Sequence, residues 1–161
     1  SPDRAQIDAA VDAVIAWLDD LPEDFTEIHL LGFSQGGAMA LQLARTQPER
    51  FASLVQLSGF VHPIPHEGDA ALLERRPRIP AFQAWGSYDP VIPSERTGAT
   101  QTWMAEHLDT EAHEYPMPHA VIPEEVSDIV TFLSRVSSDA REAHEVSSTA
   151  SDGNAPTAPR R

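Results

Sequence analysis

The fold of this chain is decided by residues 31–37, which read LGFSQGG. They follow a short apolar run and open a segment with helical spacing, so they predict a strand, a sharp turn and a helix. A Gly-x-Ser-x-Gly pattern in this context is typical of a nucleophile elbow, a turn that lifts a serine hydroxyl above a sheet. We expect Ser34 to be this nucleophile, with Gly32 and Gly36 letting the strand and the helix approach closely because they lack a Cβ. The N–H of Gln35, at the positive end of the helix dipole, is expected to stabilise an oxyanion.

The composition limits the possible partners. The 161 residues suit one domain, and a hydrophobic content of 41% supports a packed core. Acidic residues outnumber basic ones by 25 to 11, the formal net charge is −14, and every basic residue is arginine. Such a surface repels nucleic acid and anionic membranes, so we expect neither as a partner. The excess of acidic residues and the lack of lysine have two equally good explanations. One is a protein that stays soluble in high salt, and the other is the codon bias of a GC-rich genome.

The chain contains no cysteine, which excludes disulfides and thiolate metal sites within these residues. No apolar run approaches the roughly 18 residues that a membrane-spanning helix needs. No signal peptide is visible, and we expect a cytoplasmic location.

Strands and helices alternate along the chain. Apolar spacing and turn residues predict helices over 3–19, 35–46, 94–108 and 123–136, and strands over 27–32, 53–58, 80–85 and 110–115. This order predicts an α/β fold with a mainly parallel sheet flanked by helices. Residues 1–136 would form the domain, and the polar residues 137–161, with almost nothing to bury, are predicted to be a disordered tail.

A long proline-rich loop is expected between residues 60 and 78. Loops of this length in compact domains are usually functional or mobile. Its apolar side chains would either line a pocket for an acyl chain or pack the loop onto the core; they are Phe60, Val61, Ile64, Leu72 and Leu73.

Three polar residues each follow a predicted strand directly. Ser34, Asp89 and His119 would therefore meet at the carboxyl edge of the sheet, where ligands bind in parallel α/β folds. A serine hydroxyl is a weak nucleophile that needs a base within hydrogen-bond reach, and the base needs an acid to orient it. The chain order serine, acid, histidine is that of α/β-hydrolases. We therefore predict a catalytic triad of Ser34, His119 and Asp89.

Each triad position has competitors. The other histidines fall inside predicted strands or helices, in the tail or in the proline-rich loop: His29, His107, His113, His144, His62 and His66. His62 and His66 have a metal-ligand spacing only on a helix, which the intervening prolines forbid, so no metal site is expected. Asp69, and more weakly Glu67, compete with Asp89 for the role of the acid.

Four blocks resemble the phospholipase/carboxylesterase family, which includes the acyl-protein thioesterases. They read GFSQGGA at 32–38, LSG at 57–59, GSYDPVIP at 86–93 and YPMPHAV at 115–121. The resemblance extends from about residue 5 to 136. It implies an α/β-hydrolase that cleaves small carboxylic esters or thioesters with the triad above, without a metal or an organic cofactor. Members are often dimers, so a homodimer is also implied.

The chain departs from the family pattern in two ways. Pro118 stands where the family usually has glycine, which stiffens the loop before His119. The family's first strands, and with them a second oxyanion N–H, have no counterpart here, so we expect the C-terminal part of a longer enzyme. The strand over 27–32 would then be a sheet edge with unpaired backbone groups. These departures leave open a second function, a non-catalytic hydrolase-like binding domain.

Overall fold

The computed structural model describes residues 4–152, with side chains described as far as residue 137. The elements in chain order are α1 (Arg4–Asp19), β1 (His29–Phe33), α2 (Gln35–Thr46), β2 (Ser53–Leu57), α3 (Asp69–Glu74), β3 (Pro80–Gly86), α4 (Ser94–His107), β4 (Asp109–Tyr115) and α5 (Pro123–Asp152). Within the described residues, no helix is both long enough and apolar enough to cross a membrane.

The four strands form one parallel sheet in the order β1-β2-β3-β4. Because all four run the same way, their carboxyl ends share one edge, where the residues that follow them meet. Strand β1 lies at one side of the described sheet, as the sequence predicts for 27–32, and β4 lies at the other. The fold class predicted from the sequence, a mainly parallel sheet flanked by helices, is confirmed.

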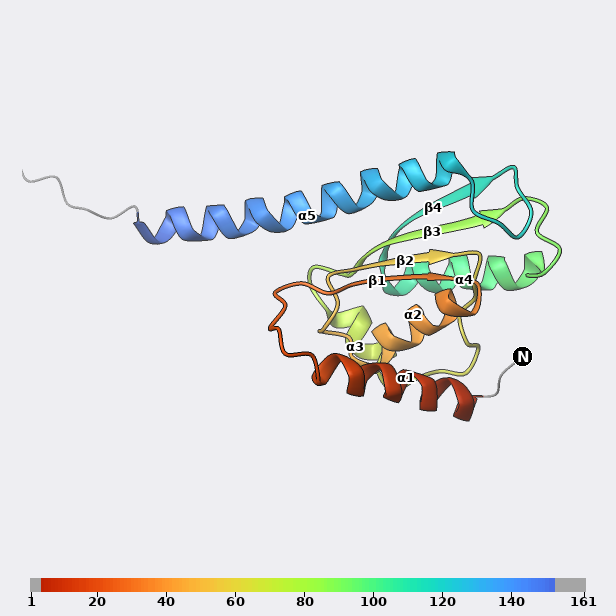
Figure 1. Cartoon of the computed structure of the whole chain (residues 1–161), viewed down its shortest axis with the longest axis horizontal. Helices are drawn as coiled ribbons and strands as arrows, with labels where there is room; N and C mark the ends of the chain where they lie inside the picture. The colour runs from red at the N-terminus through yellow and green to blue at the C-terminus, as the bar shows by residue number, and fades with distance from the viewer. Residues whose placement is uncertain (1–3, 153–161) are drawn as a thin grey trace, which may run out of the picture.

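The helices cover the two faces of the sheet unequally (Figure 1). Helices α2, α3 and α4 lie on one face with α1 packed behind α2, and α5 lies alone on the other. Strand residues alternate between the faces, so Leu54 and Ala81 pack against the α2–α4 layer while Val55 and Phe82 pack against α5. Each face therefore has its own apolar core.

The proline-rich loop contains a short helix, α3, that the sequence did not reveal. Leu72 on this helix is 1% exposed and joins the α2–α4 core together with Val61. The guanidinium of Arg45, itself 1% exposed, pairs with Asp69 at 2.7 Å and donates to the carbonyl oxygens of His62 and Ile64. Packing of the loop onto the core thus accounts for much of its apolar content.

The predicted disordered tail over 137–161 is wrong for its first part, because α5 continues to Asp152 (Figure 1). Residues 137–152 include no proline and no glycine, and the first such residue is Gly153. A helix already nucleated by packing on the sheet can propagate through such a sequence, because each added residue contributes a hydrogen bond. Residues 153–161 of the predicted tail lie outside the described part of the chain.

Candidate active site

Ser34 occupies the turn between β1 and α2 that the sequence predicts. Its backbone has φ 57° and ψ −119°, and it is one of two non-glycine residues with positive φ in the described chain. Its N–H donates to the carbonyl of Leu57 on β2 at 2.8 Å, and its own carbonyl accepts from Gly37 and Ala38 of α2. Positive φ is costly for a residue with a Cβ and is found where surrounding contacts hold the backbone, often at functional sites.

The close approach of β1 to α2 depends on Gly32. A Cβ added there would lie 2.0 Å from the carbonyl oxygen of Gly36, so only glycine fits. Gly36 itself is different: a Cβ there would meet no described atom within 4 Å. The expectation that Gly36 must lack a Cβ for close packing is therefore wrong. Gly36 takes part in the contact through its backbone carbonyl, which lies against Gly32.

The structure brings together the three side chains predicted as a triad. Nε2 of His119 lies 3.0 Å from Oγ of Ser34, and Nδ1 of the same ring lies 2.7 Å from Oδ2 of Asp89. An ionised carboxylate can only accept, so Asp89 selects the neutral tautomer in which Nδ1 carries the proton. The unprotonated Nε2 then faces the hydroxyl of Ser34 and can accept its proton.

The environment of Asp89 favours its ionised form. Its side chain is only 5% exposed, and this burial by itself would raise the pKa of the carboxyl. The N–H groups of Ile92 and Val91 donate to Oδ1 at 3.0 and 2.7 Å, and the ring of His119 donates to Oδ2. These hydrogen bonds outweigh the burial, and the pKa of Asp89 lies below its ordinary value.

The loop that carries His119 is anchored on both sides. A Cβ at Gly86 would lie 2.2 Å from the carbonyl oxygen of Met117, so the loop sits directly on the end of β3, and Met117 is fully buried. On the other side, the ring of Phe33 lies 4.8 Å from the imidazole of His119, centroid to centroid. The contact with Phe33 was not anticipated, although strand alternation places this side chain on the face opposite to Gly32.

The competitors for the acid and the base lie away from this cluster or have other partners. Asp69 is held by Arg45, and Glu67 is exposed and faces Arg4 at 3.8 Å. His29 is half-buried and hydrogen-bonded to Ser53 at 2.6 Å and to Glu27, in line with the predicted structural role. The remaining histidines with described side chains contact their own loop, helix or strand: His62, His66, His107 and His113. The side chain of His144 lies outside the description.

Two groups at the strand ends could take part in binding an oxyanion or in shaping the site. In the described chain no acceptor is hydrogen-bonded to the N–H of Gln35, the first helical N–H of α2. Ser58, which directly follows β2, has the other positive φ, 50°, and a buried hydroxyl without a hydrogen-bond partner among the described atoms. Sequence reasoning gave Ser58 no functional role, although it is a serine that follows a buried strand and precedes a glycine. Within the described residues, no three His, Asp or Glu side chains form a group that could hold a metal ion.

Comparison with known proteins agrees with this fold. The acyl-protein thioesterase 1 of Mycosarcoma maydis is 38% identical over 114 residues, which cover 65% of this chain and 46% of that protein. The crystal structure of Arabidopsis thaliana SOBER1 superposes with a TM-score of 0.69 at 25% identity, covering 84% of this chain and 67% of that one. The Zea mays acyl-protein thioesterase 2 superposes with a TM-score of 0.65 at 22% identity, with the same coverage.

The chain spans about half the length of the curated relatives that it matches. The model of the phospholipase/carboxylesterase family matches residues 4–137, the whole of the region whose side chains are described. On this match the chain belongs to the phospholipase/carboxylesterase family.

Proposed function

We propose that the protein is a serine hydrolase that cleaves carboxylic ester or thioester bonds of small acyl substrates through an acyl-enzyme. The observation that carries the proposal is the hydrogen-bonded series from Ser34 through His119 to Asp89, with distances of 3.0 and 2.7 Å. Members of this series come from three loops, each following a different strand, β1, β3 and β4. A chain without an acyl-transfer function has no need to hold these three groups in line.

In the first step, Oγ of Ser34 attacks the carbonyl carbon of the substrate while Nε2 of His119 takes the hydroxyl proton. The carbonyl oxygen becomes an oxyanion, and the imidazole becomes an imidazolium whose charge is stabilised by the ionised Asp89. The tetrahedral intermediate then collapses: its bond to the leaving alkoxide or thiolate breaks, and His119 returns the proton to that group. The products are the free alcohol or thiol and an ester of Ser34.

The second step repeats this chemistry with water. His119 takes a proton from the water as the water oxygen attacks the acyl carbon. When the second tetrahedral intermediate collapses, the bond between the acyl carbon and Oγ of Ser34 breaks, His119 returns the proton to Oγ, and the carboxylic acid is released. The N–H of Gln35 at the start of α2 is the proposed oxyanion donor in both steps, supported by the dipole of that helix. A second donor is not assigned to any described residue.

The second candidate function is a non-catalytic binding domain with the same fold. It is favoured by the assignment of a single oxyanion donor among the described residues. The aligned Ser34, His119 and Asp89 argue against it. A homodimer, implied by the resemblance, and a cytoplasmic location, expected from the sequence, remain predictions.

The test measures hydrolysis of p-nitrophenyl esters of increasing acyl length by the chain, its Ser34→Ala variant and a control, Ser127→Ala. Ser127 is exposed on α5, so its loss should leave the rate unchanged. We expect Ser34→Ala to lower kcat by about a thousandfold or more, because the nucleophile is lost. Equal rates for Ser34→Ala and the unaltered chain would refute the proposal.

A fluorophosphonate probe separates the two candidate functions, because it labels only a serine activated by its base. Labelling that disappears in Ser34→Ala but persists in Ser127→Ala supports the hydrolase. If circular dichroism shows that the chain is folded and the probe does not label it, the result would instead support the binding domain.

A further inference from the structure

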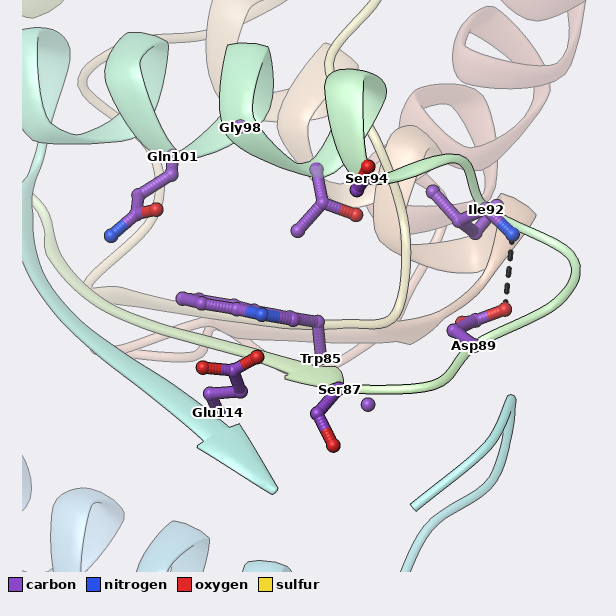
Figure 2. Close-up of a pocket in the computed structure, with 10 residues that line it drawn as sticks. Trp85, Ser87, Asp89, Ile92, Ser94, Gly98, Gln101 and Glu114 are labelled. Carbon is purple, nitrogen blue, oxygen red and sulfur yellow. Dashed lines mark hydrogen bonds between the residues drawn. The ribbon is translucent and has the colours of Figure 1, made fainter. Parts of the chain in front are cut away.

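A pocket of about 170 Å³ lies between α4 and the carboxyl halves of β3 and β4, beside the Asp89 loop (Figure 2). This volume is below that of pockets for drug-sized molecules, so it suits a ligand of only a few heavy atoms. Neither Ser34 nor His119 lines it. The pocket is therefore separate from the nucleophile and the base, although the two sites share the Asp89 loop.

Two of the side chains that line the pocket, an aromatic ring and a carboxylate, have no partner in the described chain. Trp85 of β3 is half-buried, and Figure 2 shows its indole ring between Gln101 of α4 and the carboxylate of Glu114 on β4. Across the described chain, neither the indole N–H of Trp85 nor the carboxylate of Glu114 has a hydrogen-bond or ion-pair partner. Both groups are thus available to a ligand.

The rest of the lining adds oxygen atoms but no positive charge. Hydroxyl and amide groups come from Ser87, Ser94, Thr97 and Gln101, and none of the described residues that line the pocket is basic. Asp89 contributes a second negative charge nearby, and both of its carboxylate oxygens already accept hydrogen bonds. An anion would meet two carboxylates and no cation here, whereas a cation would be attracted locally and by the net charge of −14.

We propose that this pocket binds a small organic cation with an alkylated ammonium group. The face of an indole ring attracts such a cation through its quadrupole, and a neighbouring carboxylate adds a direct charge interaction. An alkylated ammonium is also the cation that loses least on leaving water, because it donates few or no hydrogen bonds. The hydroxyl of Ser87, which lies on the same side of the ring as Glu114 in Figure 2, can hydrogen-bond to a polar group at the other end of the ligand.

Choline and its neutral isostere 3,3-dimethylbutan-1-ol test this proposal, since they match in shape and differ in charge. Binding to the full chain is measured by isothermal titration calorimetry at constant ionic strength. We expect choline to bind in the millimolar range and at least about fivefold more tightly than the isostere. Trp85→Leu should weaken choline binding about tenfold and Trp85→Phe less, because a phenyl ring retains part of the attraction.

Glu114→Gln keeps shape and removes only the charge of an exposed residue, so it should fold normally and weaken choline binding several-fold without altering binding of the isostere. Trp17→Leu and Glu106→Gln, exposed on α1 and α4, are the matched controls and should bind choline as the unaltered chain does. Ser34→Ala should also bind choline as the unaltered chain does, so the binding test can succeed or fail independently of the hydrolase proposal. Equal affinity for choline and the isostere, no binding at tens of millimolar, or full binding by Glu114→Gln and Trp85→Leu would overturn it.

Discussion

The two faces of the sheet hold the proposed catalytic groups by different means. On the α2–α4 face, four helices pack in layers, backbone meets backbone at Gly32, and the buried Arg45 ties the proline-rich loop to α2. On the other face α5 packs alone, mainly on β2 and β3. The register of β1 on β2 places Leu31 and Phe33 on this second face, where they are 59% and 38% exposed.

The proposed nucleophile and the proposed base are therefore held by different parts of the core. Ser34 is positioned by the tight contact of β1 with α2, on the densely covered face. His119 precedes α5 and packs against Phe33, on the sparsely covered face. Asp89 joins them, because its carboxylate accepts both from His119 and from the N–H groups that lead into α4. Alignment of the site therefore depends on both faces being packed, and substitutions on each face test that view.

The largest effect is expected on the dense face, for Gly32→Ala. The added Cβ would collide with the backbone of Gly36, which cannot move without displacing α2. We expect a loss of more than about 3 kcal/mol in the free energy of unfolding, or no folded protein, measured by urea denaturation. The control is Gly98→Ala in α4, where a Cβ meets no described atom within 4 Å, and it should gain about 0.5–1 kcal/mol from helix propensity. A stable Gly32→Ala variant would contradict the close contact.

An intermediate effect is expected for Asp89→Asn, at the junction of the two faces. The substitution removes a buried charge that accepts three hydrogen bonds and should cost about 1–3 kcal/mol of stability at pH 7. The folded pKa of Asp89 is lowered, so its contribution is complete above the ordinary pKa near 3.8 and is lost as the pH falls through the folded value. Urea denaturation of both proteins from pH 7 to pH 3 should show the difference shrinking with acid. A difference that does not change with pH would argue against an ionised Asp89.

A smaller effect of the opposite sign is expected on the α5 face, for Glu125→Gln. Glu125 is fully buried at the start of α5, and neither carboxylate oxygen has a hydrogen-bond partner among the described atoms. Burial raises the pKa of this carboxyl, so ionisation above its ordinary pKa of 4.5 destabilises the fold. Glutamine should therefore raise stability at pH 8, by less than Asp89→Asn lowers it, and the gain should disappear at pH 4. Thermal unfolding at both pH values measures this, and a gain that is as large at pH 4 would contradict it.

The smallest effect is expected where the sheet is uncovered, for Leu31→Ala. Leu31 is 59% exposed, so its truncation should change the free energy of unfolding by no more than about 0.5 kcal/mol. The same substitution at Leu54, fully buried on the other face one strand away, should cost about 2–5 kcal/mol. A Leu31→Ala loss that equals that of Leu54→Ala would mean that this part of the face is covered in solution.

Much of the fold could be predicted because each regular element carries its own pattern. The apolar spacing of α1, the helix-forming residues of α2 and the buried runs of β2 and β3 are local properties, and the bounds of these elements agree with the structure to within a residue or two. The short helix α3 could not be predicted, because it is stabilised by the distant Arg45 and by burial of Leu72. The extent of α5 was misjudged because a lack of apolar residues was taken as a lack of helix.

The sequence by itself determined which strand ends carry the polar residues Ser34, Asp89 and His119, because a parallel sheet collects its strand ends at one edge. It also determined that Ser34 lies in a glycine-rich turn between a strand and a helix. Only the tertiary structure decided how these side chains meet, which glycine is constrained by space, and that Trp85 and Glu114 form a pocket beside them. Those properties depend on contacts between residues far apart in the chain, and such contacts arise only when the helices pack on the sheet.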